Sequence, residues 1–401
     1  MAKRARVHSR DLQPQLATPK GLLGVARVQR FDWPATFPTT NVDELGRKLH
    51  VGTTTDIPTV TVTVEAFDTT HNTFAHLTGY TGATFPASGA SVTDLKNVDV
   101  IGQIRDASTK NIVNALYVRR GIVTGLDASF GVRANSTATY TISSNSKKEF
   151  RQPVFYEKLT LVSSGAGIAL ASTPTYLTRT SGYIIDAYRT GTDGTTGYLD
   201  ESLTAQGSDF VVTGSTIVFN GTNVAANDTI WVTYCSSTPN KLFETLDDTA
   251  PAAVQGKYVP VTISVSSIPR VQSATIRAAF AAEEILEMGA LGKPVGYETG
   301  IPDVTGDIQV LKTDNDLLAI LEGVASTTVE NDAEFAKTTL PLKIQLKDPR
   351  DTSKTVLTYY VPSITVTAEG DADTVNQSMV ETFSWASTTG ELIIMSGVGV
   401  Y

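Results

Sequence analysis

The chain has 401 residues, 41% of them hydrophobic and 18% charged, with a formal net charge of −9. This length suits two or three domains, and the composition is typical of core-forming domains rather than disordered ones. The acidic balance argues against a protein that grips nucleic acid. A single cysteine, Cys235, excludes a disulfide within the chain, and no apolar run is long enough to span a bilayer.

The charge is unevenly distributed along the chain. Residues 1–30 hold seven basic side chains and one acidic side chain, a net charge of +6, which leaves −15 for the remainder. We expect residues 1–20 to form an irregular N-terminal arm, either a docking segment or a solvated tail. The start of the chain lacks the apolar core of a signal peptide, so we expect synthesis in a cytosol without export by that route.

The first predicted strand covers residues 22–29, and residues 40–46 resemble a helical turn or loop. Valine then alternates with threonine over residues 60–64, just after Pro58. Alternation with a period of two predicts a strand with one buried face. Abundant Thr, Ser, Val and Gly in short apolar runs favour many such strands over long helices.

A short helix is predicted after this strand. Asp68 is the expected N-cap, with Thr69 and Thr70 as alternatives, and Gly79 should end the helix in the left-handed conformation. Two apolar side chains at helical spacing should face the core: Phe74 and Leu77. Residues 80–96 are rich in Gly, Ser, Thr and Pro and indicate an exposed loop.

Four further strands are predicted in the first 150 residues, at residues 98–105, 112–119, 122–132 and 138–143. The middle of the chain, residues 151–256, has its own hairpin signal. Strands 209–213 and 216–219 flank a turn at Gly214, and another strand follows at residues 229–234. We expect a small inserted β-sandwich here.

The C-terminal part repeats the pattern of the first 150 residues. Offsets of 243 or 244 align strands, an Ile-Pro dipeptide and a helix with its terminal glycine, all in the same order. The aligned positions include Arg27 with Arg270, Val28 with Val271, Gln29 with Gln272, Ile57 with Ile301, Pro58 with Pro302, Gly79 with Gly323, and Tyr117 with Tyr360. Strand alternation alone does not explain a constant offset over more than a hundred residues. We therefore expect two copies of one β domain, at residues 21–150 and 257–401, with a module at 151–256 between them.

The sequence contains no pattern of residues typical of a catalytic or metal-binding site. His71 and His76 are five residues apart, which places them on different faces of a helix, and we expect them at a surface. Cys235 follows an aromatic strand and is expected to be a small buried hydrophobe. No phosphate-binding or nucleophile motif occurs, so we expect no enzyme activity, no cofactor and no metal.

The two copies each resemble the tail tube protein domain of long-tailed bacteriophages. The resemblance rests on a first strand, the stretch Glu44-Leu45-Gly46, Ile-Pro before an alternating strand, a short helix ending in Gly, and a final hairpin pair. It covers about two thirds of the chain and implies a mainly β fold of two tandem tail-tube-type β-sandwich or barrel domains, each with a short helix. The middle module resembles the small β-sandwiches that decorate phage tails.

The resemblance implies a structural subunit of the virion tail. Proteins of this kind with two domains form homotrimeric, pseudo-hexameric rings, which stack into a hollow channel for DNA delivery. It also implies contacts with tape measure, tail terminator and tip proteins, no membrane partner, and DNA passing through the lumen without specific binding. A module projecting outward leaves no room for a contractile sheath, so we expect a non-contractile tail.

Candidate lumen-facing residues lie in the hairpin 121–131 and its counterpart 364–374. They are acidic, and they are Asp127, Glu369, Asp371 and Asp373. The alternative for these carboxylates is the outer loop surface. Loops 80–96 and 324–338 are candidates for contacts between rings.

Two other functions remain open at this point. A glycan-binding adhesin built from β-sandwiches would need clustered exposed aromatic side chains, whereas Trp33, Trp231 and Trp385 are dispersed. An enzyme would need a compact pocket containing carboxylates with strongly shifted pKa values.

Overall fold

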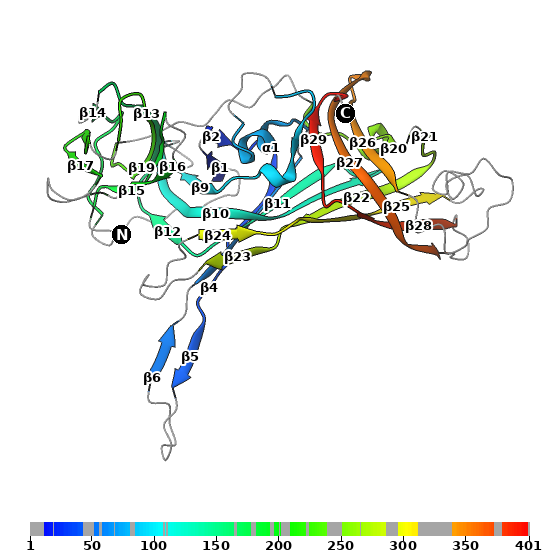
Figure 1. The fold of residues 1–401 in the computed structure, drawn as a ribbon, viewed down its shortest axis with the longest axis horizontal. Coiled ribbons are helices and arrows are strands. Elements are labelled where there is room, and N and C mark those ends of the chain that lie inside the picture. The colour runs from blue at the N-terminus through cyan, green and yellow to red at the C-terminus, as the bar shows by residue number, and fades with distance from the viewer. Residues whose placement is uncertain are drawn as a thin grey trace, which may run out of the picture. The chain divides into compact units, whose positions relative to one another are not determined.

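A computed structural model of the chain is mainly β, with many antiparallel strands and one short α-helix among the residues described (Figure 1). These residues are 12–18, 20–42, 52–55, 58–67, 69–80, 85–106, 109, 111–163, 167–177, 182–192, 196–199, 201, 209–221, 224–238, 251–264, 266–285, 296–311, 339–372 and 379–399. The chain divides into two compact units, each assembled from three segments. The first unit holds residues 1–25, 98–121 and 146–245, and the second holds residues 26–97, 122–145 and 246–401.

The first unit contains a five-stranded antiparallel sheet. Its order is β2 (Gly21–Gly24), β1 (Leu12–Thr18), β9 (Val98–Arg105), the first half of β10 (Ile112–Gly131) and β12 (Lys147–Phe150). The expectation that residues 1–20 are irregular is therefore wrong for β1. β1 forms part of the core because its apolar residues Leu16 and Ala17 are buried, each at most 2% exposed.

The middle module forms the rest of the first unit. One sheet has the order β13 (Val154–Thr160), β19 (Thr229–Cys235), β15 (Ile184–Thr190) and β16 (Thr196–Tyr198). The other has the order β14 (Gly167–Ala169), β18 (Thr216–Phe219) and β17 (Phe210–Thr213). Both sheets contribute to one hydrophobic core, which includes Phe210, Ile217, Ile230 and Tyr234. The predicted hairpin and the strand after it are confirmed, and Gly214 in the turn has a positive φ of 63°.

The second unit contains a long antiparallel sheet that combines strands from both ends of the chain. Its order is β3 (Val28–Asp32) with β4 (Ala35–Thr36), then β7 (Thr59–Ala66), β11 (Thr137–Ser144), the second half of β10, β22 (Val271–Ala279), β25 (Asp303–Leu311), β28 (Val380–Ser387) and the second half of β27 (Asp351–Ala372). We call it the long sheet.

A second sheet in this unit is built around the first half of β27. Its order is β21 (Ser266–Ser267), β20 (Val261–Ile263), β26 (Leu340–Asp348), β27, β29 (Ile393–Ser396) and β8 (Ala90–Ser91). Leu342, Ile344 and Val361 from this sheet are all below 1% exposed. Phe130 of the long sheet packs edge-on against Tyr359, with ring centroids 5.5 Å apart.

Strand pairing in the C-terminal part follows the same order as in the first 150 residues. The run β21–β20–β26–β27–β29 has the order of β2–β1–β9–β10–β12, and β22–β25–β28–β27 has the order of β3–β7–β11–β10. Bulges recur as well, because the β10 register shifts between Val123 and Gly125 and the β27 register shifts between Val366 and Ala368.

Arg27 and Arg270 repeat a strained backbone conformation. Both have a positive φ of 57°, which is uncommon for a residue with a side chain. Each carbonyl accepts a hydrogen bond from the side-chain amide two residues on, from Gln29 at 3.0 Å and Gln272 at 3.1 Å. The Arg-Val-Gln sequence therefore has the same positive φ and the same side-chain hydrogen bond in both copies.

The helix α1 (Asn72–Leu77) confirms the predicted helix and its end. Gly79 has φ 68°, and Phe74 and Leu77 are at most 1% exposed. The N-cap is His71, so Thr69 and Thr70 were wrong as candidates, and Asp68 lies outside the described residues. The Thr69 hydroxyl instead donates to the carbonyl of Pro251 at 2.8 Å.

Several loop predictions need correction. Residues 40–46 were expected to be a helical turn or loop, but β5 (Thr39–Val42) pairs with β6 (Gly52–Thr55) as a hairpin. The 80–96 stretch is not simply an exposed loop, because β8 joins β29 and Val92 is only 1% exposed. His76 was expected at a surface and is buried in α1. The predicted second helix and the 324–338 loop lie outside the described residues.

Candidate functional site: a polar sheet face and two open strand edges

One face of the long sheet is polar across all its strands. Thr and Ser dominate it, and residues directly opposite one another in the register share it. A single row across the sheet reads Arg30, Glu65, Thr139, Asp127, Arg277, Thr305, Ala386 and Thr365. Alternation of side chains along each strand puts this face opposite the core. The sequence therefore builds a broad hydroxyl-lined surface that no strand contributes alone.

The charges on this face are few and mainly negative. The registers place two positive and five negative residues there, a net charge of −3: Arg30, Arg277, Asp32, Glu65, Asp127, Asp303 and Asp307. At least one of these carboxylates accepts a hydrogen bond from a hydroxyl group, because Ser384 Oγ donates to Asp307 Oδ1 at 2.7 Å. Partial burial raises the pKa of Asp127 above its usual value, and the positive charge of Arg277 opposes that shift.

The acidic residues singled out in the sequence do not share one face. Asp127 is opposite Thr139 and Arg277, on the polar face. Glu369 is opposite Phe383, whose side chain is 2% exposed, so Glu369 belongs to the core-facing side. Asp371 is paired with Glu381 in the backbone register, and its side chain and all of Asp373 lie outside the described residues.

The junction between the two halves of the long sheet is an ordinary strand pairing. β10 meets β22 from Gly125 opposite Ala279 to Gly131 opposite Ser273. On the core-facing side this junction is apolar, and its residues are at most 3% exposed: Leu126, Ala128, Phe130, Ala274, Ile276 and Ala278. The same pairing buries apolar side chains on both strands, so it is a continuous part of the core.

The long sheet ends in two open edges within the described part of the chain. At one end, β3 and β4 pair only with β7. At the other end, residues 368–372 of β27 pair only with β28. By the repeat offset of 243, the first edge corresponds to β22 and the second to the second half of β10, which are joined to each other inside the chain.

The core-facing side of the β3–β4 edge is aromatic, and the backbone of this edge is able to accept a strand. Phe31 and Trp33 are half-buried, with ring centroids 4.7 Å apart, and Phe37 is 69% exposed. Pro34 does not block the edge, because the Pro34 carbonyl accepts from Thr61 N at 3.1 Å and this position therefore faces β7. Backbone polar groups alternate sides along a strand, so those of Trp33 and Ala35 point outward.

Two short hairpins are separate from the larger sheets in the described part of the chain. β5 pairs only with β6 in the described residues, and β23 (Ala282–Ile285) pairs only with β24 (Gly296–Thr299). Their positions differ by 243 in the first strand and 244 in the second, as expected for copies. Both β5 and β6 are labelled in Figure 1.

A cluster of buried charge lies in the first unit. Tyr117 Oη and the Arg120 backbone N–H each donate to Asp99 at 2.7 Å, and Arg119 pairs with Asp186 of the module. Burial, reinforced by the negative charge of Asp186, raises the pKa of Asp99 to about 7. Each carboxylate has donors from the structure around it, which is typical of a structural anchor between β10 and β15.

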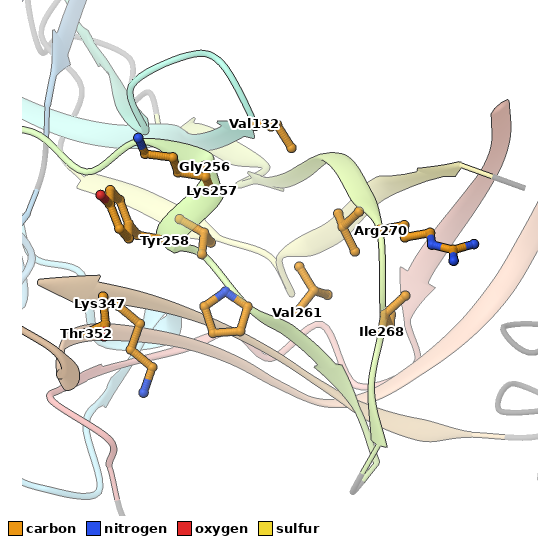
Figure 2. Close-up of a pocket in the computed structure, with 12 residues that line it drawn as sticks. Val132, Gly256, Lys257, Tyr258, Val261, Ile268, Arg270, Lys347 and Thr352 are labelled. Carbon is orange, nitrogen blue, oxygen red and sulfur yellow. The ribbon is translucent and has the colours of Figure 1, made fainter. Parts of the chain in front are cut away.

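An open pocket of about 280 Å³ lies beside β20 and β26, and Figure 2 shows the residues around it. Lys257, Arg270 and Lys347 line it, but their charged ends point in different directions. Lys257 Nζ lies over the Tyr258 ring at 5.0 Å, and Lys347 Nζ donates to Thr355 at 2.7 Å. These cations do not converge on a common point, so the pocket lacks the focused charge of an anion site.

Other signs of chemistry are weak in the part of the chain that the structure describes. No group of three or more His, Cys, Asp or Glu side chains there is placed to hold a metal ion. Burial raises the pKa of the Cys235 thiol to about 12, so it stays protonated, as expected for a buried hydrophobe. Trp231 and Trp385 are 6% and 2% exposed and are not available to stack on a glycan. No described helix is long and apolar enough to cross a membrane.

No protein-family model matches the chain, and no curated protein matches its sequence. The features of the described residues that bear on function are the polar face, the two open edges and the internal junction.

Proposed function

We propose that the chain is a structural subunit of a bacteriophage tail tube. It comprises two tandem tail-tube-type domains with an inserted β-sandwich, and it has no catalytic role. Three chains close into a pseudo-hexameric ring, and the rings stack into a hollow channel through which DNA is delivered. The site that performs this function is the pair of open edges together with the polar face.

The observation that carries the proposal is the β10–β22 junction. It joins one repeat to the next within a chain, and the open edges of β27 and β3–β4 are the corresponding strands left over at the two ends. An interface of this head-to-tail kind either closes into a ring or grows into an open filament. Exposed strand edges, normally an aggregation hazard, then become bonding surfaces.

The internal junction also specifies the register between chains. Gly125 opposite Ala279 becomes Ala368 opposite Thr36, and Leu126 opposite Ala278 becomes Glu369 opposite Ala35. The outward backbone groups of Trp33 and Ala35 would then bond to β27 of the neighbouring chain. Three such junctions and three internal ones give six similar junctions around the ring.

In this ring the polar face lines the channel. Its net charge of −3 per chain repels the phosphates of duplex DNA, which carries one charge per roughly 1.7 Å of axis. The two arginines of this face, Arg30 and Arg277, lie among five carboxylates, and Arg30 pairs with Asp32, so its described residues form no cationic patch to hold the duplex. DNA would pass without specific contacts.

The remaining parts have outward roles in this proposal. The module at 151–256 decorates the tube surface, which favours a non-contractile tail. The β5–β6 and β23–β24 hairpins, rather than the loops suggested by sequence, are the better candidates for contacts between rings. Tape measure, terminator and tip proteins are the partners that the proposed role requires.

Disulfide trapping tests the proposed junction. Ala368→Cys and Thr36→Cys would lie directly opposite each other at a non-hydrogen-bonded position, where Cα atoms are ~4.5 Å apart and a disulfide can form. In the double variant we expect oxidation to give dimers and trimers on a non-reducing gel, with the ladder ending at three chains. Negative-stain images of the same sample should show rings or tubes.

The control pairs Ala368→Cys with Thr39→Cys, three residues further along the edge and out of reach. A protein that stays monomeric in all salt conditions and shows no cross-link would overturn the proposal. A ladder that continues past three chains would retain the strand junction and reject the closed trimer.

A further inference from the structure

Two phenylalanines lie at the same place in the two copies, one at the β3–β4 edge and one at the internal junction. The offset of 243 aligns Phe37, which follows β4, with Phe280, which follows β22. Each lies two residues after an alanine, Ala35 or Ala278, that is opposite a valine at most 1% exposed. Because side chains alternate along a strand, both phenylalanines lie on the core-facing side of the sheet.

The surroundings of these two phenylalanines differ. β10 runs beside β22, Phe280 is half-buried, and the Phe280 backbone N–H donates to the Thr124 carbonyl at 3.0 Å. Phe37 lies at the edge where β3 and β4 pair only with β7 among the described residues, and it is 69% exposed. The same side chain is therefore partly covered at the internal junction and largely uncovered at the corresponding open edge.

The residue that accepts the hydrogen bond from Phe280 is the extra residue of a β-bulge. The pairing of β10 with β11 skips Thr124, and a bulge leaves its extra residue out of that ladder. The pairing of β27 with β28 skips Thr367 in the same way. Thr124 is half-buried beside β22, whereas Thr367 is exposed at the free edge. The two open edges thus carry the two halves of a contact that the internal junction has already made.

We propose that Phe37 is the anchor that sets the register between β3–β4 of one chain and β27 of a second copy of this chain. The Phe37 N–H donates to the Thr367 carbonyl of the neighbouring chain, as Phe280 does to Thr124, and the Phe37 ring packs against the bulge. The described part of this β27 edge has one bulge, so a pairing displaced by two residues loses the hydrogen bond and leaves the ring in water. This inference rests on the proposed ring and names the residue that aligns its chains.

Removal of the ring tests the affinity of the contact. In Phe37→Ser we expect the protein concentration needed for assembly to rise roughly tenfold, because aromatic anchors carry a large share of interface energy. Phe37→Leu keeps an apolar side chain, so its threshold should lie between those of the wild type and the serine variant. Sedimentation and light scattering over a dilution series of the full chain measure the threshold.

A second measurement reports the register itself. Thr36→Cys with Ala368→Cys traps the register copied from the internal junction, and Thr36→Cys with Gly370→Cys traps a register displaced by two residues. With Phe37 present, the first pair should cross-link strongly and the second weakly. When Phe37→Ser is added to each pair, the displaced cross-link should gain relative to the first. Gly370 suits this test because a Cβ there meets nothing within 4 Å.

A matched control separates the position of Phe37 from a general loss of exposed apolar surface. Val162 lies in the middle module and is 84% exposed, and Val162→Ser removes an apolar side chain away from both edges. Its assembly threshold should equal that of the wild type. Thermal unfolding of the unassembled Phe37 variants should be unchanged, because the Phe37 side chain is largely exposed.

The outcomes distinguish this inference from the proposed function. If the wild type assembles and Phe37→Ser has the same threshold, the anchor is rejected while the tube subunit stands. A higher threshold without any gain in the displaced cross-link rejects Phe37 as the residue that sets the register. If Val162→Ser raises the threshold as much as Phe37→Ser, the effect is nonspecific and the anchor is again rejected. If neither the wild type nor any variant associates, the tube function fails and the anchor with it.

Discussion

At the scale of single residues, the two copies solve the same packing problem with different side chains. In the first copy Val62 is opposite Ile142, and at the corresponding place in the second copy Gly306 is opposite Trp385. A Cβ on Gly306 would approach Trp385 Cζ2 to 2.5 Å and would also meet the Thr275 carbonyl. Glycine is required here because the tryptophan fills the space that valine occupies in the first copy.

This compensation predicts the stability of variants. Gly306→Ala should lower the free energy of unfolding by roughly 3 kcal/mol, since overpacking against backbone cannot relax easily. The double variant Gly306→Val with Trp385→Ile recreates the pair of the first copy and should recover part of the loss. Denaturant unfolding measures both. The control is Gly370→Ala, which has nothing within 4 Å, and equal losses for Gly306 and Gly370 would contradict the argument.

Asp99 predicts a pH dependence of the first unit. Its pKa is raised to about 7 in the folded state, mainly by burial, so the folded state binds more protons than the unfolded state between about pH 4 and pH 7. The contribution of Asp99 to stability is thus complete at low pH and falls as the pH rises through this window. The wild type should lose stability relative to Asp99→Asn over that range.

Thermal unfolding of the two proteins from pH 4 to pH 8 provides the measurement. The difference in stability between the two proteins removes the contributions of carboxylates whose pKa is lowered in the folded state, such as Asp228 and Asp348. Those contributions change at lower pH and have the opposite sign. Parallel pH profiles for the two proteins would show that Asp99 is charged throughout.

At the scale of elements, the direction of backbone groups decides which prolines the β3–β4 edge tolerates. Pro34 occupies a position that faces β7, whereas the N–H of Ala35 points outward. Ala35→Pro removes an outward donor without touching the β7 pairing, so the subunit should fold and its assembly should be strongly reduced. Circular dichroism and sedimentation separate the two effects. Normal assembly of this variant would place the interface elsewhere.

The elements best predicted from sequence are those with regular alternation. β7, β9, β17 and β18 lie within one or two residues of the predicted ranges, since valine–threonine alternation and a turn glycine are local signals. β1 was missed because its sequence, with Pro14 and two glutamines, has no such alternation. One of its two partners, β9, is more than eighty residues away, and pairing of that kind leaves no local signal.

The faces of the candidate acidic residues were harder to predict. A bulge adds one residue to a strand and moves every later side chain to the other face. The bulges in β10 and β27 break simple alternation in both strands, but they are equivalent and precede both residues. Asp127 and Glu369 lie on opposite faces because Asp127 aligns with Gly370, one residue beyond Glu369. The repeat could have predicted the face of Glu369, because the offset of 243 aligns Glu369 with Leu126, a residue with an apolar side chain.

At the scale of the whole molecule, the charge of the polar face gives a functional prediction. Changing Asp127→Lys and Asp303→Lys shifts the face from −3 to +1 per chain, while both positions lie away from the strand edges. Tubes of this variant should retain duplex DNA at low salt and release it as salt rises. Co-sedimentation of tubes with labelled DNA measures this, and equal retention by wild-type tubes would argue against the polar face as the lumen.

The β10–β22 junction also has a consequence for how the protein is made. Residues 122–131 leave the ribosome about 142 residues before their partner at 273–279, a delay of roughly 7 to 28 s at ordinary synthesis rates. During this time Leu126 and Phe130 lack the strand that covers them, while the first unit can already close around residue 245. The nascent chain therefore exposes an apolar, unpaired strand edge close to other nascent chains on the same polysome. We expect chaperones to bind the nascent chain mainly during this interval of translation.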